Sequence, residues 1–220
     1  MIEYDFKNVY RPSDDTYLIV DYFKHHIDFN YFDGIIPLEN VRYLLDMGTG
    51  TGYLALFFQI VKTRIPKFNP KIIASDILKE AINLAKLNEK LNNFKGEIEF
   101  IHSDLFKSFP KIYKQCLDII VFNPPYLPSF VEKIDPKQKI DRSWDGGEEG
   151  FEIFIDFISQ AKEFLRKETK ARIYYICSSR TKLNLFYNMI KERGFKNTIL
   201  ERRHIFLEDI YLNMLETYPD

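Results

Sequence analysis

A short apolar stretch from Asp118 to Phe122, which stops at Asn123-Pro124-Pro125-Tyr126, restricts the fold of this chain more than any other feature. Its apolar residues are mostly β-branched and do not alternate with polar ones, as in a parallel strand covered on both faces. Proline has a fixed φ and no backbone N–H, so the two prolines prevent the strand from continuing. The sequence therefore predicts a sheet with helices on both sides and a rigid polar corner at the end of this strand.

Strand-like and helix-like segments alternate along the rest of the chain. Apolar runs predict strands at 42–46, 72–76, 97–101 and 173–177, besides 118–122. Amphipathic or capped segments predict helices that begin at 12–16 and end before 33–34, and that cover about 53–62, 81–91, 151–165 and 178–194. Residues from about 197 to 217 predict two strands joined by a turn. This order indicates an α/β fold, a three-layer sandwich with a seven-stranded, mostly parallel sheet whose last strand is antiparallel.

Composition argues against several classes of protein. A chain of 220 residues is long enough for one domain with a substantial core, and its net charge of -1 gives no overall preference for polyanions. No segment approaches the ~20 apolar residues of a membrane span, and the start lacks the charge pattern of a signal peptide. The two cysteines and four histidines show no metal-ligand spacing. We therefore expect a soluble cytoplasmic protein without a metal.

Polar residues end four of the predicted strands. They are Asp46, Asp76, Asp104 and Asn123. Aspartate is common in turns, so one such residue indicates little. Because ligands of parallel sheets bind beyond the carboxyl ends of the strands, four in series indicate a ligand with many polar groups.

The turn from Asp46 to Gly52 contains alternating glycines at 48, 50 and 52. It misses the dinucleotide fingerprint Gly-x-Gly-x-x-Gly, because Tyr53 stands where the third glycine is needed. Asp46 would repel a pyrophosphate, but it can pair with an ammonium group. Asp76 is suitably placed to accept the ribose hydroxyls, and Asp104 to accept from the adenine amine. S-adenosylmethionine, which becomes S-adenosylhomocysteine after transfer, satisfies all three conditions.

The motifs resemble those of a known family. Residues 46–52, Asp76, Asp104 and 123–126 together are similar to class I S-adenosylmethionine-dependent methyltransferases that act on planar amide or amino nitrogens. The segments 9–16 and 143–150 resemble the release-factor glutamine methyltransferases of the HemK/PrmC family, in the short archaeal and eukaryotic branch. The resemblance implies a Rossmann-like methyltransferase fold over 1–220, with 1–41 as a helical lead-in and 127–150 as a substrate-side loop.

Site residues follow from the motifs together with the resemblance, which alone assigns Thr16 to the cofactor carboxylate. The predicted cofactor-binding residues are Thr16, Asp46, Gly48, Gly50, Asp76, Ile77, Asp104, Leu105 and Asn123. The predicted catalytic residues are Asn123, Pro124 and Tyr126, and the predicted substrate-binding residues are Asn123, Pro125 and Tyr126.

The polar corner suits methylation of an NH₂ group. Such a nitrogen is a weak nucleophile, because its lone pair is delocalised into the attached carbonyl or ring. The Asn123 side-chain oxygen and the Pro124 carbonyl can each accept one N–H, which favours a pyramidal nitrogen. Tyr126 offers a ring face for a planar group. No general base is required, because the methyl donor is already cationic.

Several functions fit this corner. The flanking resemblance favours the glutamine of the Gly-Gly-Gln motif in a translation release factor, with a small zinc-binding activator subunit as a partner that pairs with a sheet edge. The same chemistry also serves the exocyclic amine of adenine or guanine in RNA or DNA. A cofactor-binding scaffold without activity would not need Asn123 and Tyr126, and a simple turn after a strand would not need the glycine turn and the aspartates.

Overall fold

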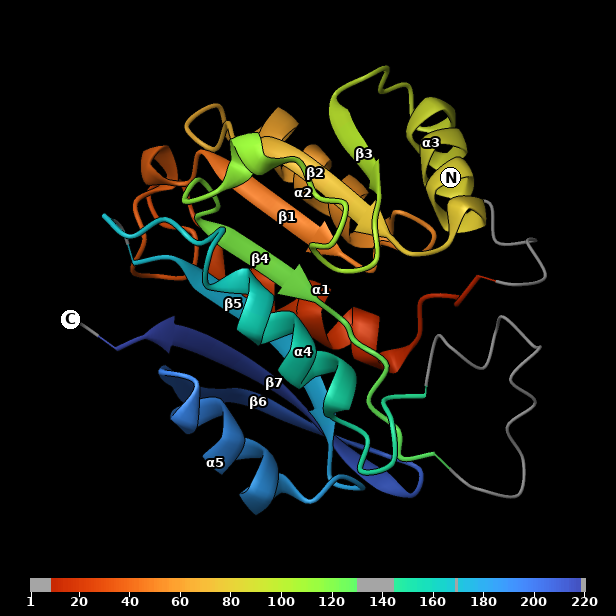
Figure 1. Ribbon diagram of the computed structural model, residues 1–220. Coiled ribbons are helices and arrows are strands. Elements are labelled where there is room, and N and C mark those ends of the chain that lie inside the picture. The colour runs from red at the N-terminus through yellow and green to blue at the C-terminus, as the bar shows by residue number, and fades with distance from the viewer. Residues whose placement is uncertain (1–8, 130–144, 169, 219–220) are drawn as a thin grey trace.

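The computed structural model describes residues 9–129, 145–168 and 170–218, and its centre is one seven-stranded sheet (Figure 1). The strand order is β3-β2-β1-β4-β5-β7-β6. Neighbours from β3 to β5 are parallel, whereas β7 is antiparallel to both β5 and β6. The predicted fold is confirmed. The strands are β1 (Tyr43–Met47), β2 (Lys71–Asp76), β3 (Ile98–His102), β4 (Ile119–Phe122), β5 (Arg172–Ser178), β6 (Phe195–Ile205) and β7 (Glu208–Thr217).

The helices lie between the strands as predicted, with shifted boundaries. They are α1 (Asp14–His26), α2 (Tyr53–Arg64), α3 (Lys79–Leu91), α4 (Glu152–Ala161) and α5 (Leu183–Glu192), with short 3₁₀ turns η1 (Leu38–Asn40) and η2 (Lys111–Tyr113). Ser13 is the N-cap residue of α1, but its side chain makes no capping hydrogen bond. The predicted start of the fifth helix at Ser178 is wrong. Ser178 still belongs to β5, and its hydroxyl accepts the Arg180 N–H in a turn before the helix.

Both faces of the sheet are covered, which explains the unbroken apolar runs. In β1, Leu44 packs in the cluster formed with α1 and α2, whereas Leu45 packs in the cluster formed with α4 and α5. Figure 1 shows α4 and α5 in front of the sheet. Because successive side chains of a strand point to opposite faces, residues on both registers must be apolar. None of the described helices combines the length and apolarity needed to span a bilayer.

The strand order reverses direction between β1 and β4. From β1 the chain proceeds through β2 to β3 on one side, and from β4 to β5 on the other. In open parallel sheets the crevice outside the carboxyl ends at such a switch point is the usual ligand site. The loops after β1, β2, β3 and β4 all leave the sheet at this edge, beside the first turn of α1.

Candidate active site

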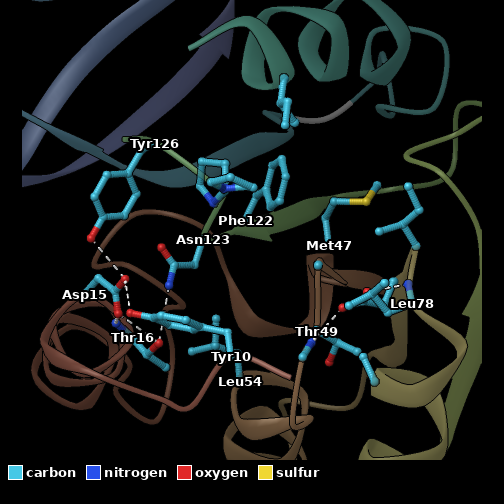
Figure 2. A pocket seen from close by; sticks show the side chains of 18 of the residues that line it. Tyr10, Asp15, Thr16, Met47, Thr49, Leu54, Leu78, Phe122, Asn123 and Tyr126 are labelled. Carbon is cyan, nitrogen blue, oxygen red and sulfur yellow. Dashed lines mark hydrogen bonds between the residues drawn. The ribbon is translucent and has the colours of Figure 1, made fainter. Parts of the chain in front are cut away.

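A cavity of ≈ 670 Å³ opens at this edge (Figure 2). Its walls come from the segment before α1, the first turn of α1, the loops after β1 to β4, the first part of α4 and the turn between β6 and β7. The volume lies in the range of small-molecule sites, which is about 300 to 1,000 Å³. All but one of the predicted site residues line it, namely Thr16, Gly48, Gly50, Asp76, Ile77, Asp104, Leu105, Asn123, Pro124, Pro125 and Tyr126.

The glycine turn presents bare backbone to the cavity. Gly48, Gly50 and Gly52 have φ values of +66°, +54° and +83°, a region that side chains disfavour. A Cβ atom at Gly52 would also lie 2.9 Å from the Ala85 Cβ of α3. The Gly50 N–H donates to Asp76 Oδ2 at 2.9 Å, which ties the turn to the end of β2. The turn is therefore a fixed surface against which a ligand can lie closely.

Asp46 is the predicted residue that does not line the cavity. Its Oδ2 accepts the Thr49 hydroxyl at 2.6 Å and the Ala55 N–H at 3.0 Å, while its buried Oδ1 has no partner in the described part of the chain. Burial raises the pKa of Asp46 to about 7, and the nearby Asp76 adds to the shift. Asp46 thus supports the glycine turn from behind. Its pairing with an ammonium group stays a prediction.

The raised pKa of Asp46 predicts a pH-dependent stability. The folded state holds this proton up to about pH 7, whereas the unfolded chain releases it near 3.8. The folded state therefore binds more protons between these values, and the free energy of unfolding falls as pH rises through this window. Relative to Asp46→Asn, the wild type should lose up to about 1.4 kcal/mol per pH unit between pH 5 and 7. Urea denaturation at several pH values measures the difference, and a constant difference would contradict the assignment.

The ends of β2 and β3 also contribute carboxylates. Asp76 is buried, and its Oδ1 accepts the Leu78 N–H at 2.8 Å, in addition to the Gly50 bond on Oδ2. Burial raises its pKa. Asp104 is paired with Lys107 at 2.7 Å, and Leu105 adopts a left-handed φ of +48°. Non-glycine residues in this conformation concentrate at functional sites.

The polar corner holds an unpaired acceptor. The Asn123 Nδ2 donates to the Thr16 hydroxyl oxygen at 3.3 Å, and Figure 2 shows this pair beside Tyr126. At its other end, Asn123 Oδ1 is buried without a hydrogen-bond partner among the residues described. Buried polar groups are nearly always paired, so such an atom calls for an explanation. A ligand N–H is a suitable partner.

Asp15 and Tyr10 belong to this site but were not predicted individually. Asp15 is 3% exposed. Its carboxylate accepts hydrogen bonds from Tyr10 Oη at 2.9 Å, Tyr126 Oη at 3.1 Å and the Thr16 N–H at 2.5 Å. Burial and this carboxylate both raise the pKa of Tyr126. The only signal in the sequence was the segment 9–16, in which the acids also fit the start of a helix.

A second segment supports the corner from the other side. Gly146 N–H donates to the Leu127 carbonyl at 2.9 Å, and Ser129 N–H donates to the Gly147 carbonyl at 2.8 Å. These bonds join the two described ends of the predicted 127–150 loop. Residues 130–144, including Ser143 and Trp144 of the predicted motif, lie outside the described residues.

Gly150 should be intolerant of a side chain. Its φ is +83°, and a Cβ atom would lie 2.7 Å from the Tyr126 carbonyl oxygen and 2.9 Å from the Pro128 nitrogen. Gly150→Ala should therefore displace the corner and lower kcat about tenfold to 100-fold, as expected for a shift on the order of 1 Å. Gly34→Ala is the matched control, because Gly34 has a φ of +76° and nothing within 4 Å of the added Cβ. If Gly150→Ala has the same kcat as Gly34→Ala, the absence of a side chain at Gly150 is not needed to position the corner.

Comparison with known proteins identifies the family of the chain. Residues 39–216 match the family model described as a methyltransferase domain. The chain is 34% identical over 203 residues to the "Putative protein N5-glutamine methyltransferase MJ0928" of Methanocaldococcus jannaschii, covering 92% of this chain and 88% of that protein. The chain belongs to the class I methyltransferases of the HemK type.

Two further relatives cover almost the same length of this methyltransferase. The eRF1 methyltransferase catalytic subunit mtq2 of Schizosaccharomyces pombe is 26% identical over 90% of this chain and 85% of its own length. The solved structure of the E. cuniculi Mtq2–Trm112 complex, which methylates the termination factor eRF1, matches with a TM-score of 0.63 at 23% identity. It covers 96% of this chain and 99% of that one, and at this identity it supports the fold alone.

Proposed function

We propose that this methyltransferase transfers a methyl group from S-adenosylmethionine to the side-chain amide nitrogen of the glutamine in the Gly-Gly-Gln motif of a translation release factor. The observation that carries the proposal is the buried, unpartnered acceptor Asn123 Oδ1, on a residue that lines the cavity together with the predicted cofactor residues. The names of the relatives support the substrate, because they specify protein glutamine and eRF1.

The cavity fits the cofactor. Its glycine turn leaves backbone open at one wall, and Asp76 and Asp104 supply carboxylate oxygens at the ends of neighbouring strands. We assign Asp76 to the ribose hydroxyls, Asp104 to the adenine amine and Thr16 to the methionine carboxylate. The Thr16 hydroxyl already donates to Asp15 Oδ1 at 3.2 Å. A hydrogen bond from this hydroxyl to the cofactor carboxylate would therefore compete with the bond to Asp15, unless another atom of Thr16 binds the cofactor. When bound, the cofactor would supply an electrophilic methyl group on a sulfonium.

The chain's own groups would prepare the target nitrogen. Asn123 Oδ1 and the Pro124 carbonyl each accept a hydrogen bond from one N–H of the glutamine amide. This weakens the conjugation of the nitrogen lone pair with the carbonyl of the glutamine side chain. The Tyr126 ring lies beside these two acceptors, and its hydroxyl is hydrogen-bonded to Asp15. The fixed ring can therefore pack against the plane of the substrate amide. Correct placement of the two reactants then supplies much of the rate.

The charge of the cavity favours a protein substrate over the nucleic-acid alternative. Its lining includes the carboxylates of Asp15, Asp76, Asp104, Asp145, Asp156 and Glu208. Among the described lining residues Lys107 is the sole cationic side chain, and it is paired with Asp104. Nucleic-acid sites gain most of their affinity from lysine and arginine contacts to phosphates. A strand carrying one phosphate per nucleotide would meet repulsion here.

Labelled cofactor tests the proposal directly. Purified enzyme is incubated with it and with release factor, tRNA, rRNA or DNA in separate reactions. Label should enter the release factor, and Gln→Asn in its Gly-Gly-Gln motif should abolish the labelling. Label in a nucleic acid but not in the release factor would overturn the proposal in favour of a nucleobase target.

We also propose a partner and a domain organisation. A small activator subunit is supported by the E. cuniculi complex with Trm112 and by the description of the S. pombe relative as a catalytic subunit. That the activator binds zinc rests on the family resemblance. Residues 1–220 would form one methyltransferase domain, in which α1 of the 1–41 lead-in closes the cavity beside the corner.

A further inference from the structure

We propose that Asp15 and Thr16 form a directional hydrogen-bond relay that decides which end of the Asn123 side-chain amide is left as an unpaired acceptor. Both would be positioning residues for the transfer step. The inference rests on the proposed function, in that it explains how the corner presents an acceptor to an NH₂ group. One contact within the first turn of α1 and two contacts between α1 and the residues after β4 carry it.

The relay begins at a group that can only accept. An ionised carboxylate has no hydrogen to donate, and a threonine hydroxyl has only one. Asp15 Oδ1 accepts both the Thr16 N–H at 2.5 Å and the Thr16 hydroxyl at 3.2 Å. Bonds to an ionised acceptor are roughly twice as strong as neutral ones, so the Thr16 hydrogen is directed to Asp15. The Thr16 oxygen can then only accept from its next neighbour.

That next neighbour is the Asn123 amide, 3.3 Å away. An asparagine side chain has nearly the same shape in its two orientations, with an NH₂ group at one end and an oxygen at the other. Only the NH₂ end can donate to Thr16, so the oxygen is left at the opposite end, where it has no partner among the described residues. The reverse orientation would set the Asn123 donors against the donors of the target NH₂. The relay therefore converts an ambiguous side chain into a defined acceptor.

The same carboxylate holds the rest of the corner. Asp15 Oδ2 accepts the hydroxyl groups of Tyr10 and Tyr126 at 2.9 and 3.1 Å. No cationic side chain within the described ranges forms an ion pair with Asp15, so these donors alone stabilise its buried charge. Figure 2 shows the two tyrosines and Asn123 converging on Asp15 and Thr16. Two parts of the predicted catalytic corner thus depend on one residue of α1.

Asp15→Asn and Thr16→Val test the relay. Asparagine has the shape of aspartate, but its NH₂ group can donate a hydrogen bond. Valine has the shape of threonine and has no hydroxyl. Each should lower kcat about tenfold to 100-fold, and Asp15→Asn should keep the cofactor Kd within about threefold. Thr16→Ser should lose much less than Thr16→Val. Asp14→Asn is the matched control, because Asp14 is the adjacent, exposed acid and does not line the cavity.

A double variant separates amide orientation from general damage. Asn123→Asp has an acceptor at both ends and needs no relay, so Asp15→Asn added to it should cause a clearly smaller loss of kcat than in the wild type, which leaves only the effect on the Tyr10 and Tyr126 contacts. Equal losses in the two backgrounds would overturn the relay, as would wild-type kcat in Asp15→Asn. Thermal melting checks that each variant folds. Thr16→Val keeps the hydrogen bonds from Tyr10 and Tyr126 to Asp15 and removes only the Thr16 hydroxyl. Its kcat therefore tests the relay even if Asp15→Asn does not fold.

A spectroscopic measurement needs no methyl acceptor. The Asn123 side-chain NH₂ signals in a ¹H–¹⁵N spectrum are identified by their absence in Asn123→Asp. They should shift in Asp15→Asn and Thr16→Val but not in Asp14→Asn, and unchanged signals in the first two would overturn the relay. If the wild type methylates a nucleobase instead of the release factor, the proposed substrate fails while this measurement still decides the relay.

Discussion

Asn123→Ala is expected to lower kcat by about 10²- to 10³-fold while the cofactor Kd changes by less than about threefold. The variant removes the unpartnered Oδ1, the acceptor that we assign to one N–H of the target amide. Loss of one preorganised polar contact at a developing charge has effects of this size. The Nδ2 at the other end of the side chain already donates to Thr16 within the protein. Single-turnover assays and isothermal titration calorimetry measure the two quantities separately.

A matched control uses another asparagine. Asn188 is exposed on α5, outside the cavity, so Asn188→Ala should keep both kcat and Kd. Asn123→Asp should retain more activity than Asn123→Ala, because a carboxylate oxygen can also accept. If Asn123→Ala instead weakened cofactor binding strongly at an unchanged kcat, Asn123 would be a cofactor residue and not the acceptor for the substrate amide.

Asp76→Ala is expected to have the opposite pattern, with its main effect on cofactor affinity. We expect a loss of about 2 kcal/mol, or roughly 30-fold in Kd, for hydrogen bonds to a charged acceptor. Both carboxylate oxygens of Asp76 already accept backbone N–H groups, from Leu78 and Gly50, and each oxygen has a further lone pair. The variant would therefore remove the ribose contact and also release the glycine turn that forms one wall of the cavity.

Comparison of substrate and product cofactors makes this prediction specific. S-adenosylmethionine and S-adenosylhomocysteine share the ribose but differ by the charge on sulfur. Asp76→Ala should weaken both to a similar extent in calorimetric titrations. A loss confined to S-adenosylmethionine would mean that Asp76 acts on the sulfonium charge, and unchanged affinity for both would mean that the ribose is bound elsewhere.

The elements could be predicted where local physics decides them. The apolar run at 118–122 is buried completely, and the prolines after it end β4 as expected. The beginning of α5 could not be predicted, because Ser178 also suits a helix cap. Its side chain instead bonds within a turn and to Glu208 of β7. Ser178 belongs to the strand and not to a helix cap because β5 pairs with β7. This pairing joins residues that are far apart in the sequence, so the residues around Ser178 do not predict it.

Site residues divide in the same way. Asp76 could be predicted because a strand end and the parallel topology together place it at the cavity edge. Asp46 ends the same kind of apolar run but lies behind the glycine turn, since its Oδ2 bonds to Thr49 and Ala55. Strand position alone does not distinguish a side chain that faces the cavity from one that supports its wall.

The sequence by itself determined which groups the corner carries and how rigid its backbone is, since Asn123 to Tyr126 are consecutive and the prolines restrict their backbone without help from distant residues. Only the tertiary structure decided how that corner is oriented. Thr16 and Asn123 are separated by 107 residues, and Asp15 and Tyr126 by 111. These contacts exist because α1 packs against the sheet, through a hydrophobic interface that places its first turn beside the end of β4. Burial of apolar surface is not directional, so the sequence pattern predicts that α1 packs there but not which of its polar side chains meets Asn123.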